Sequence, residues 1–273
     1  MSTFEAIVLG IVQGLTEFLP ISSTAHLRIV PAFAGWDDPG AAFTAVTQLG
    51  TMAAVLLYFR HDLARIGRAW VASVPNRELR GGPDAKIGWF IVIGTIPISI
   101  FGLLFRNQIE DGARDLYLIG STLIVLGVVL LVAEKVSDHE RSMDQLNWRD
   151  GITIGFAQAL ALVPGVSRSG ATLTAGLFLG LKREAAARFS FLLSVPAVVL
   201  SGLFQLPDVF DGKEASAAVV PTAIATLFAF VAGYASIAFL LSFLQNHSTY
   251  VFIGYRVALG AVVIVLVAAS VIA

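Results

Sequence analysis

The sequence predicts an all-α polytopic membrane protein, because its 273 residues are 56% hydrophobic and only 14% charged, with a mean hydropathy of +0.81. A soluble protein of this length needs more polar surface than that. Six apolar stretches are each long enough to cross a bilayer as a helix. They cover residues 41–59, 87–105, 116–133, 189–206, 218–244 and 251–273. We therefore expect about six transmembrane helices in a single integral membrane domain, residues 1–273.

Two further apolar segments, near residues 3–34 and 151–181, are interrupted by polar residues close to their middle. The first is broken by FLPISSTAH (18–26) and the second by PGVSRSG (164–170). Irregular backbone is tolerated at membrane depth only where it is buried in protein or lines a water-filled cavity. We therefore predict two re-entrant helix–loop–helix hairpins that share one cavity.

The positively charged residues are unevenly distributed over the predicted loops. Twelve of the 18 Lys and Arg residues fall in the loops 60–86, 134–150 and 182–188. Positive residues are enriched in cytoplasmic loops, so these three loops are expected inside and both chain ends outside. The first hairpin then opens on the outside and the second on the inside. The basic residues expected outside are Arg28, Arg106, Arg114 and Lys213.

Hairpins that open on opposite sides are what an inverted-topology repeat produces. Four residues of the first interrupted segment recur 145 positions later: Gly10, Gln13, Leu15 and Ser22 match Gly155, Gln158, Leu160 and Ser167. We therefore predict a first repeat over residues 1–135 and a second over 150–273. Sites in such proteins commonly lie near the midplane where the halves meet, so the two interrupted segments are expected to face each other.

Arg168 is the only charged residue between Gly151 and Leu181. A guanidinium near the middle of a bilayer costs about 2.5–3.5 kcal/mol on insertion scales, so it is expected to face a wet cavity, an acidic partner or a bound anion. A helix start beside an arginine suits phosphate or carboxylate, and the glycines and hydroxyls nearby allow close approach and supply donors. The candidate anion-binding residues here are Gly165, Ser167, Arg168, Ser169, Gly170 and Thr172.

Glu17 follows Gln13 by four residues, so on a helix both side chains project from one face toward the break at Pro20. A carboxylate in an apolar segment is costly without a partner. In one interpretation Glu17 only pairs with Arg168 or caps an internal hydrogen-bond network. In the other it also binds a divalent cation, together with Gln13, or moves a proton.

Hydroxyl groups and an imidazole follow Glu17 closely, in Ser22, Ser23, Thr24 and His26. A serine needs a nearby base to become a useful nucleophile, and histidine, with an unperturbed pKa of about 6.5, suits that role. One hypothesis is therefore attack on phosphorus by Ser23 with His26 as base or acid. The other is that these side chains only satisfy backbone groups within the hairpin.

The segments QGLTEFLPISSTAH (13–26) and PGVSRSGAT (164–172) resemble the two signature motifs of the bacterial undecaprenyl-diphosphate phosphatase family, also called the bacitracin-resistance family. The resemblance covers essentially the whole chain. Gln13 stands where many members have Glu, a substitution that the motif permits. The residues that match the motifs are Glu17, Ser22, Ser23, His26, Ser167, Arg168, Ser169 and Thr172.

The resemblance implies a phosphatase that removes the terminal phosphate from a C55 polyprenyl diphosphate, yielding the monophosphate lipid carrier for cell-wall synthesis and conferring bacitracin resistance. It also implies a homodimer in the bacterial inner membrane, an outward-facing site and a divalent cation, Mg²⁺ or Ca²⁺. Glu17, Ser23, His26 and Arg168 are then expected to be catalytic, and Glu17 and Gln13 to hold the cation. The residues expected to bind the substrate are Ser22, Thr24, Gly165, Ser167, Ser169, Gly170 and Thr172.

The residues alone leave a second class open, a secondary transporter or flippase for polyprenyl phosphate or another anion, because broken helices and a midplane arginine suit transport as well. A net charge of −1 gives no reason to expect nucleic-acid binding, and the absence of cysteine excludes a thiol nucleophile. Arg256 is expected to snorkel to the cytoplasmic surface, with a role beside the cavity as the alternative. The pairs Gly10/Gly14 and Gly151/Gly155 are expected to mark close helix packing.

Overall fold

The computed structural model describes residues 1–105, 115–210 and 219–272, and for residues 41–42 and 201–210 it describes the backbone alone. Arg106, Arg114 and Lys213, which the sequence assigns to the outer side, lie outside the described residues. Within the described ranges the chain is helical, and the only β-type pairing is an isolated bridge between Arg141 and Leu181.

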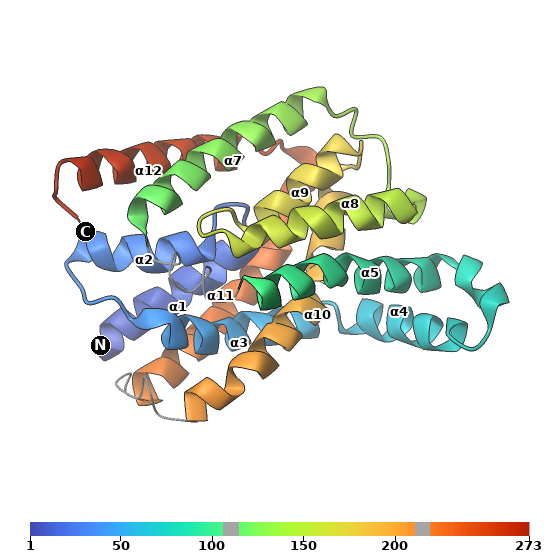
Figure 1. The fold of residues 1–273 in the computed structure, drawn as a ribbon, viewed down its shortest axis with the longest axis horizontal. Helices are drawn as coiled ribbons and strands as arrows, with labels where there is room; N and C mark the ends of the chain where they lie inside the picture. The colour runs from blue at the N-terminus through green and yellow to red at the C-terminus, as the bar shows by residue number, and fades with distance from the viewer. Residues whose placement is uncertain (106–114, 211–218, 273) are drawn as a thin grey trace.

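The chain order of the elements can be followed in Figure 1. The first part contains α1 (Thr3–Phe18), α2 (Ser23–Ala34), α3 (Gly40–Tyr58), α4 (Arg60–Ser73), η1 (Arg77–Gly81) and α5 (Pro83–Leu104). The second contains α7 (Leu116–Val136), η2 (Met143–Gln145), α8 (Trp148–Ala159), η3 (Leu160–Leu162), α9 (Arg168–Phe178), α10 (Arg183–Phe210), α11 (Val219–Asn246) and α12 (Tyr250–Ala268).

Among the described residues, α5, α7, α11 and α12 are long and apolar enough to cross a membrane. α3 contains a shorter apolar helix, Phe43–Tyr58, and α10 covers the predicted crossing at 189–206. Each of the six predicted crossings therefore corresponds to a helix, and the chain is an all-α polytopic membrane protein.

The two predicted helix–loop–helix hairpins are present, as α1 with α2 and as α8 with α9. Figure 1 shows that they enter the bundle from opposite ends and that their tips lie near its middle. α1 packs along α11, whereas α8 packs along α5. The first helix of each hairpin therefore lies against a long apolar helix from the other part of the chain.

Glycines set the separation at both of these contacts. A Cβ atom at Gly10 would lie 2.3 Å from the backbone oxygen of Ala225, and one at Gly155 would lie 2.5 Å from the Cα atom of Gly94. These distances are shorter than non-bonded atoms tolerate, so only glycine lets the two backbones approach. The prediction that the GxxxG spacings mark close helix packing is confirmed.

The three basic loops are joined at one end of the molecule, and both chain termini lie at the other end (Figure 1). Arg188 of the third loop pairs with Asp62 of the first at 2.6 Å, and Arg183 of the third loop donates to Glu134 of the second at 2.7 Å. Within the second loop, Arg141 pairs with Asp150 at 2.6 Å. The hydrogen bond to Asp150 raises the pKa of Arg141 above its ordinary value, so Arg141 keeps its positive charge. The loop predicted at 60–86 contains the helix α4, which folds back onto α5. The predicted grouping of loops and termini on opposite ends is therefore observed.

The buried core lies directly beside the hairpin tips. Phe18, at the end of α1, packs edge-to-face on Phe191 of α10 with ring centroids 5.3 Å apart. Phe59 lies next to the same ring, at 6.2 Å. Such aromatic pairs contribute about 0.5–1.5 kcal/mol beyond their buried area. Because Phe18 follows Glu17 directly, this packing fixes the end of α1 where the polar residues meet.

Candidate active site

A serine with positive φ turns the chain at each hairpin tip. Ser22 has φ of 73° and Ser167 has φ of 71°, a conformation that residues other than glycine rarely adopt. Each serine caps the following helix, since its Oγ accepts the N–H of Ala25 or of Gly170. The same local geometry therefore starts α2 and α9, and the N-termini of both helices lie where the tips meet.

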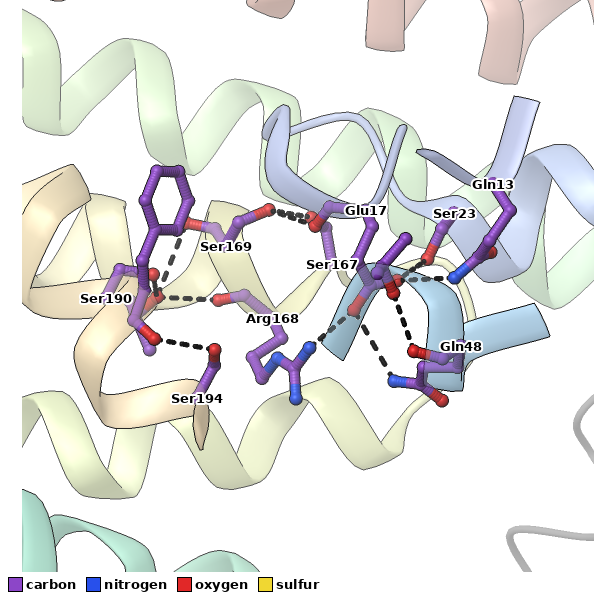
Figure 2. Close-up of polar contacts among 12 residues, drawn as sticks. Gln13, Glu17, Ser23, Gln48, Ser167, Arg168, Ser169, Ser190 and Ser194 are labelled. Atoms are coloured by element: carbon purple, nitrogen blue, oxygen red, sulfur yellow. Dashed lines mark hydrogen bonds and ion pairs between the residues drawn. The ribbon is translucent and has the colours of Figure 1, made fainter. Parts of the chain in front are cut away.

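Glu17, in the last turn of α1, accepts hydrogen bonds on both carboxylate oxygens (Figure 2). Oε1 accepts from Arg168 Nη2 at 2.5 Å and from Gln48 Nε2 at 3.4 Å. Oε2 accepts from Ser23 Oγ at 2.6 Å and from Gln13 Nε2 at 3.1 Å. The Glu17 side chain is only 7% exposed. A buried carboxylate is tolerated when it is paired and hydrogen-bonded, and this one has both kinds of partner.

Arg168 brings the second tip to the first. Glu17 and Arg168 are 151 residues apart in the chain, so their ion pair confirms that the two interrupted segments face each other. Within the described residues, Glu17 is the one protein acceptor of the Arg168 guanidinium. A guanidinium has five N–H donors in a planar fork, so most of them remain available to an anion.

The ring nitrogens of His26 have other partners than Ser23. Nδ1 lies 2.7 Å from the backbone oxygen of Ser22, and Nε2 lies 2.7 Å from the hydroxyl of Tyr255. The Ser23 hydroxyl instead donates to Glu17. The structure therefore pairs the expected nucleophile Ser23 with Glu17, rather than with the His26 expected as its base or acid.

Arg256 of α12 binds backbone oxygens of both tips. Nη1 donates to Pro20 O at 3.0 Å, and Nη2 donates to Gly165 O at 3.2 Å and Val166 O at 3.0 Å. Nε donates to Leu123 O at 3.4 Å. Arg256 is 0% exposed, so the expectation that it snorkels to the surface is wrong. Irregular backbone at membrane depth needs such donors, because no water is there to satisfy its carbonyls.

Two residues expected to bind substrate, Ser169 and Thr172, make hydrogen bonds within the protein. Ser169 Oγ donates to Leu19 O at 3.0 Å, which ties the second tip to the first. Thr172 is fully buried and shares a 2.5 Å hydrogen bond with Ser190 of α10. Ser169 and Thr172 therefore hold α9 in place. Ser169 Oγ also reaches the backbone oxygen of Glu17 at 3.4 Å, but neither hydroxyl bonds the Glu17 carboxylate.

The two glycines of the second tip are required by close approach. Gly165 has φ of 82°, and a Cβ atom there would lie 2.1 Å from Thr122 Oγ1. A Cβ atom at Gly170 would lie 2.6 Å from Arg256 Nη1.

The first tip differs at its surface, where Thr24 is exposed and its hydroxyl lies 3.1 Å from Ser22 Oγ.

Gln13 offers a second oxygen beside the Glu17 carboxylate. Its Oε1 is buried and has no hydrogen-bond partner among the described residues. A carboxylate and an amide oxygen suit a hard cation such as Mg²⁺ or Ca²⁺. The described residues contain no group of three or more His, Cys, Asp or Glu side chains that could hold a metal. The donor set therefore fits a cation that takes its remaining ligands from phosphate oxygens and water.

The sequence did not single out Gln48 or Tyr255, and a position of Arg256 beside the cavity was only the alternative expectation. Gln48 is the only amide in the stretch 41–59, and Arg256 is the only charged residue in 251–273. The signal that singled out Arg168, an isolated polar residue in an apolar run, would have found both. Tyr255 carries no such signal, because tyrosines are common at membrane boundaries.

Comparison with known proteins assigns this chain to a family. The sequence profile described as "Bacitracin resistance protein BacA" matches residues 6–262. The chain belongs to the bacitracin resistance protein BacA family. Both hairpin tips, and all of the polar residues that they carry, lie within the part that matches the BacA profile.

Relatives of the BacA-family chain are similar over their full length. The Undecaprenyl-diphosphatase of Nocardioides sp. is 55% identical, with 98% of each chain covered. The Undecaprenyl-diphosphatase of Prosthecochloris aestuarii is 54% identical, again with 98% of each chain covered. That of Mycolicibacterium smegmatis is 54% identical over 100% of this chain and 99% of the relative.

Proposed function

We propose that this protein is an undecaprenyl-diphosphate phosphatase, which hydrolyses the terminal phosphate of C55 polyprenyl diphosphate and releases the monophosphate lipid carrier. The observation that carries the proposal is the partly buried cluster of Arg168, Glu17 and Ser23, which combines an anion-binding group, a base and a hydroxyl. The full-length similarity to proteins named Undecaprenyl-diphosphatase supports this substrate. Family membership also favours hydrolysis over a transporter or flippase.

Arg168 binds the diphosphate in this mechanism. Stabilising charge on the transferring phosphoryl group is the main task in phosphoryl transfer. α9 begins at Arg168, so its partly positive N-terminus adds to the charge of the guanidinium. An incoming diphosphate competes with Glu17 for Arg168, and this competition frees the carboxylate to accept a proton.

Ser23 is the nucleophile and Glu17 its base. The Ser23 hydroxyl already donates to Glu17 Oε2 at 2.6 Å, so its proton passes to the carboxylate as Oγ attacks the terminal phosphorus. The bond from that phosphorus to the bridging oxygen breaks, and the lipid monophosphate leaves. Water then hydrolyses the phosphoserine and restores Ser23. Direct attack by water, with Glu17 again as base, is the second route.

A divalent cation, Mg²⁺ or Ca²⁺, fits the site through Glu17 and Gln13 and would neutralise part of the diphosphate charge when bound. We further propose a homodimer in the bacterial inner membrane, with the first hairpin entering from the outer side. Positive residues on the loops at the end opposite the termini support this orientation, and the resemblance to the family supports the dimer.

The test is phosphate release from undecaprenyl diphosphate by purified protein in detergent. We expect Arg168→Ala to lower the rate by about 10³-fold, because arginines at such sites contribute 10³ or more. Arg149→Ala, an exposed arginine in α8, is the matched control and is expected to keep the wild-type rate. Chelating divalent cations is expected to stop release. No release by folded wild type across cations and pH would overturn the proposal.

The nucleophile is tested separately. With terminally radiolabelled substrate, a phosphoenzyme is expected in wild type and not in Ser23→Ala, which should also lose turnover. Normal turnover by Ser23→Ala would exclude the serine route and leave direct attack by water.

A further inference from the structure

His26 is buried at the first tip, and both of its ring nitrogens are used. Nδ1 lies 2.7 Å from the backbone oxygen of Ser22 and Nε2 lies 2.7 Å from the hydroxyl of Tyr255 in α12. The two rings are nearly parallel, with an interplanar angle of 8° and centroids 5.6 Å apart. Tyr255 therefore holds the ring of His26 through this hydrogen bond, with the two rings nearly parallel.

The hydrogen bonds define the protonation of the ring. A carbonyl oxygen only accepts, so Nδ1 of His26 carries a proton. In the neutral ring Nε2 is then an acceptor, and the Tyr255 hydroxyl donates to it. This arrangement leaves His26 no free nitrogen that faces Ser23.

The peptide that His26 binds determines where Ser23 lies. Ser22 has φ of 73°, and its carbonyl oxygen also accepts the backbone N–H of His26 at 3.2 Å. The next residue, Ser23, donates to Glu17 at 2.6 Å. A rotation of the Ser22 peptide would move the Ser23 hydroxyl away from Glu17. His26 is placed to prevent that rotation.

The second tip shows that the turn itself does not need a histidine. Ser167 has nearly the same φ, 71°, and Ala171 occupies the position 145 residues after His26. The Ala171 N–H donates to Ser167 O at 2.8 Å, so the turn closes with backbone alone. The extra hydrogen bond from an imidazole occurs only at the tip where the next residue is the candidate nucleophile.

We propose that His26 and Tyr255 are positioning residues for the reaction: His26 holds the Ser22 carbonyl through Nδ1–H, Tyr255 holds the imidazole, and together they keep Ser23 against Glu17. This inference rests on the proposed phosphatase function. The competing role is proton transfer through Nε2 of His26.

Two substitutions separate these roles. The side-chain nitrogen of asparagine occupies a place close to Nδ1 of histidine, whereas that of glutamine lies close to Nε2. His26→Asn therefore keeps a donor for Ser22 O, and its kcat is expected within about 10-fold of wild type. His26→Gln is expected to lose about 10²-fold, the effect of misplacing a reacting group by about 1 Å. Equal losses of 10² or more in both variants would overturn the proposal in favour of proton transfer.

Tyr255→Phe tests the second residue. We expect Tyr255→Phe to lower kcat several-fold with KM unchanged. Adding Tyr255→Phe to His26→Asn should lower kcat no further, because the imidazole ring that Tyr255 holds is already absent. Tyr250→Phe is the control, since Tyr250 lies in the same helix and is 49% exposed, compared with 45% for Tyr255. Full additivity in the double variant, or no effect of Tyr255→Phe, would contradict the proposal.

A readout independent of turnover distinguishes this proposal from the proposed function. In ¹⁵N spectra of histidine-labelled protein in detergent, the His26 signal is the one that disappears in His26→Asn. It is expected to show a neutral ring with its proton on Nδ1 and to become mixed in Tyr255→Phe. The assignment by substitution is needed because Nδ1 of His247 also faces a carbonyl oxygen, that of Phe243, at 3.1 Å. If wild type shows this tautomer and yet releases no phosphate, the phosphatase proposal fails and the contact stands. If the His26 signal does not show the Nδ1–H form, the positioning proposal fails even when the enzyme is fully active.

Discussion

In the first hairpin the capping serine is followed by Ser23, and in the second the capping serine is followed by Arg168. Five residues before the cap, the first hairpin carries Glu17 where the second carries Leu162. The caps themselves have φ of 73° and 71°, and each begins a helix. The backbones of the two tips thus agree closely at the cap, whereas the side chains around it differ.

This difference teaches how two similar turns form one site. Two acidic tips would repel each other, and two arginine tips would leave charge unpaired in a membrane. One acidic and one basic tip neutralise each other through the ion pair of Glu17 and Arg168. In the proposed mechanism the basic tip binds the diphosphate and the acidic tip accepts the proton. We propose that the halves 1–135 and 150–273 are inverted repeats that diverged at these positions, a proposal supported by helix starts at Thr3 and Trp148 and at Ser23 and Arg168.

Arg256→Leu is expected to have the largest effect, because Arg256 is the residue that binds carbonyls of both tips. Each buried carbonyl left without a donor costs about 1–3 kcal/mol, so the variant should unfold at much lower temperature and lose phosphate release. Arg256→Lys retains one donor group and is expected to keep the fold with reduced activity. Thermal unfolding in detergent and phosphate release check both variants. Wild-type behaviour of Arg256→Leu would show that the tips do not depend on α12.

Gly165→Ala is expected to disrupt the second tip alone. The left-handed φ of 82° costs an alanine about 1–2 kcal/mol, and the contact of 2.1 Å with Thr122 Oγ1 adds overpacking of about 1–3 kcal/mol. Gly35→Ala is the control, since Gly35 has φ of 68° with open space around it and meets only the first cost. Unfolding temperatures in detergent measure both. Equal decreases in unfolding temperature for the two variants would mean that the second tip moves enough to accommodate the added methyl group.

Much of this arrangement was predictable from isolated polar residues in apolar stretches. The breaks at 18–26 and 164–170 indicated two hairpins, and the charges of Glu17 and Arg168 indicated that the tips meet, because each charge needs a partner at membrane depth. The distribution of basic residues indicated that the hairpins enter from opposite ends, as Figure 1 shows.

The side-chain directions within the site were not predictable in the same way. His26 is three residues from Ser23, which suggested a contact, but its ring turns toward Tyr255, 229 residues further along the chain. Arg256 lies near a helix start, which suggested a route to the surface, yet it points into the protein. Both directions depend on how α12 packs on α2 and α7, and that packing is decided by residues far apart in the sequence.

Ser22→Ala and Ser167→Ala test whether the two caps are equivalent in stability. Loss of an N-cap hydroxyl typically costs about 1 kcal/mol, so both variants should be destabilised by about that amount. Ser167→Ala is expected to lose more stability, because Ser167 Oγ accepts the N–H of Gly170 at 3.1 Å, whereas Ser22 Oγ accepts the N–H of Ala25 at 3.4 Å. The measurement is thermal unfolding in detergent. If the stability losses of the two variants differ by more than about 2 kcal/mol, the two serines do not cap their helices equivalently.

The smallest effect on stability is expected at Thr24, whose counterpart 145 residues later is Ser169. Thr24 is exposed at the first tip, so Thr24→Val should change the free energy of unfolding by less than about 0.5 kcal/mol. Ser169→Ala removes the hydrogen bond to Leu19 O and should cost about 1 kcal/mol. If Thr24 binds the diphosphate, as the resemblance to the family implies, Thr24→Val raises KM several-fold while kcat and stability stay near wild type. An unchanged KM would remove Thr24 from the binding site and leave its hydroxyl as a partner of Ser22 alone.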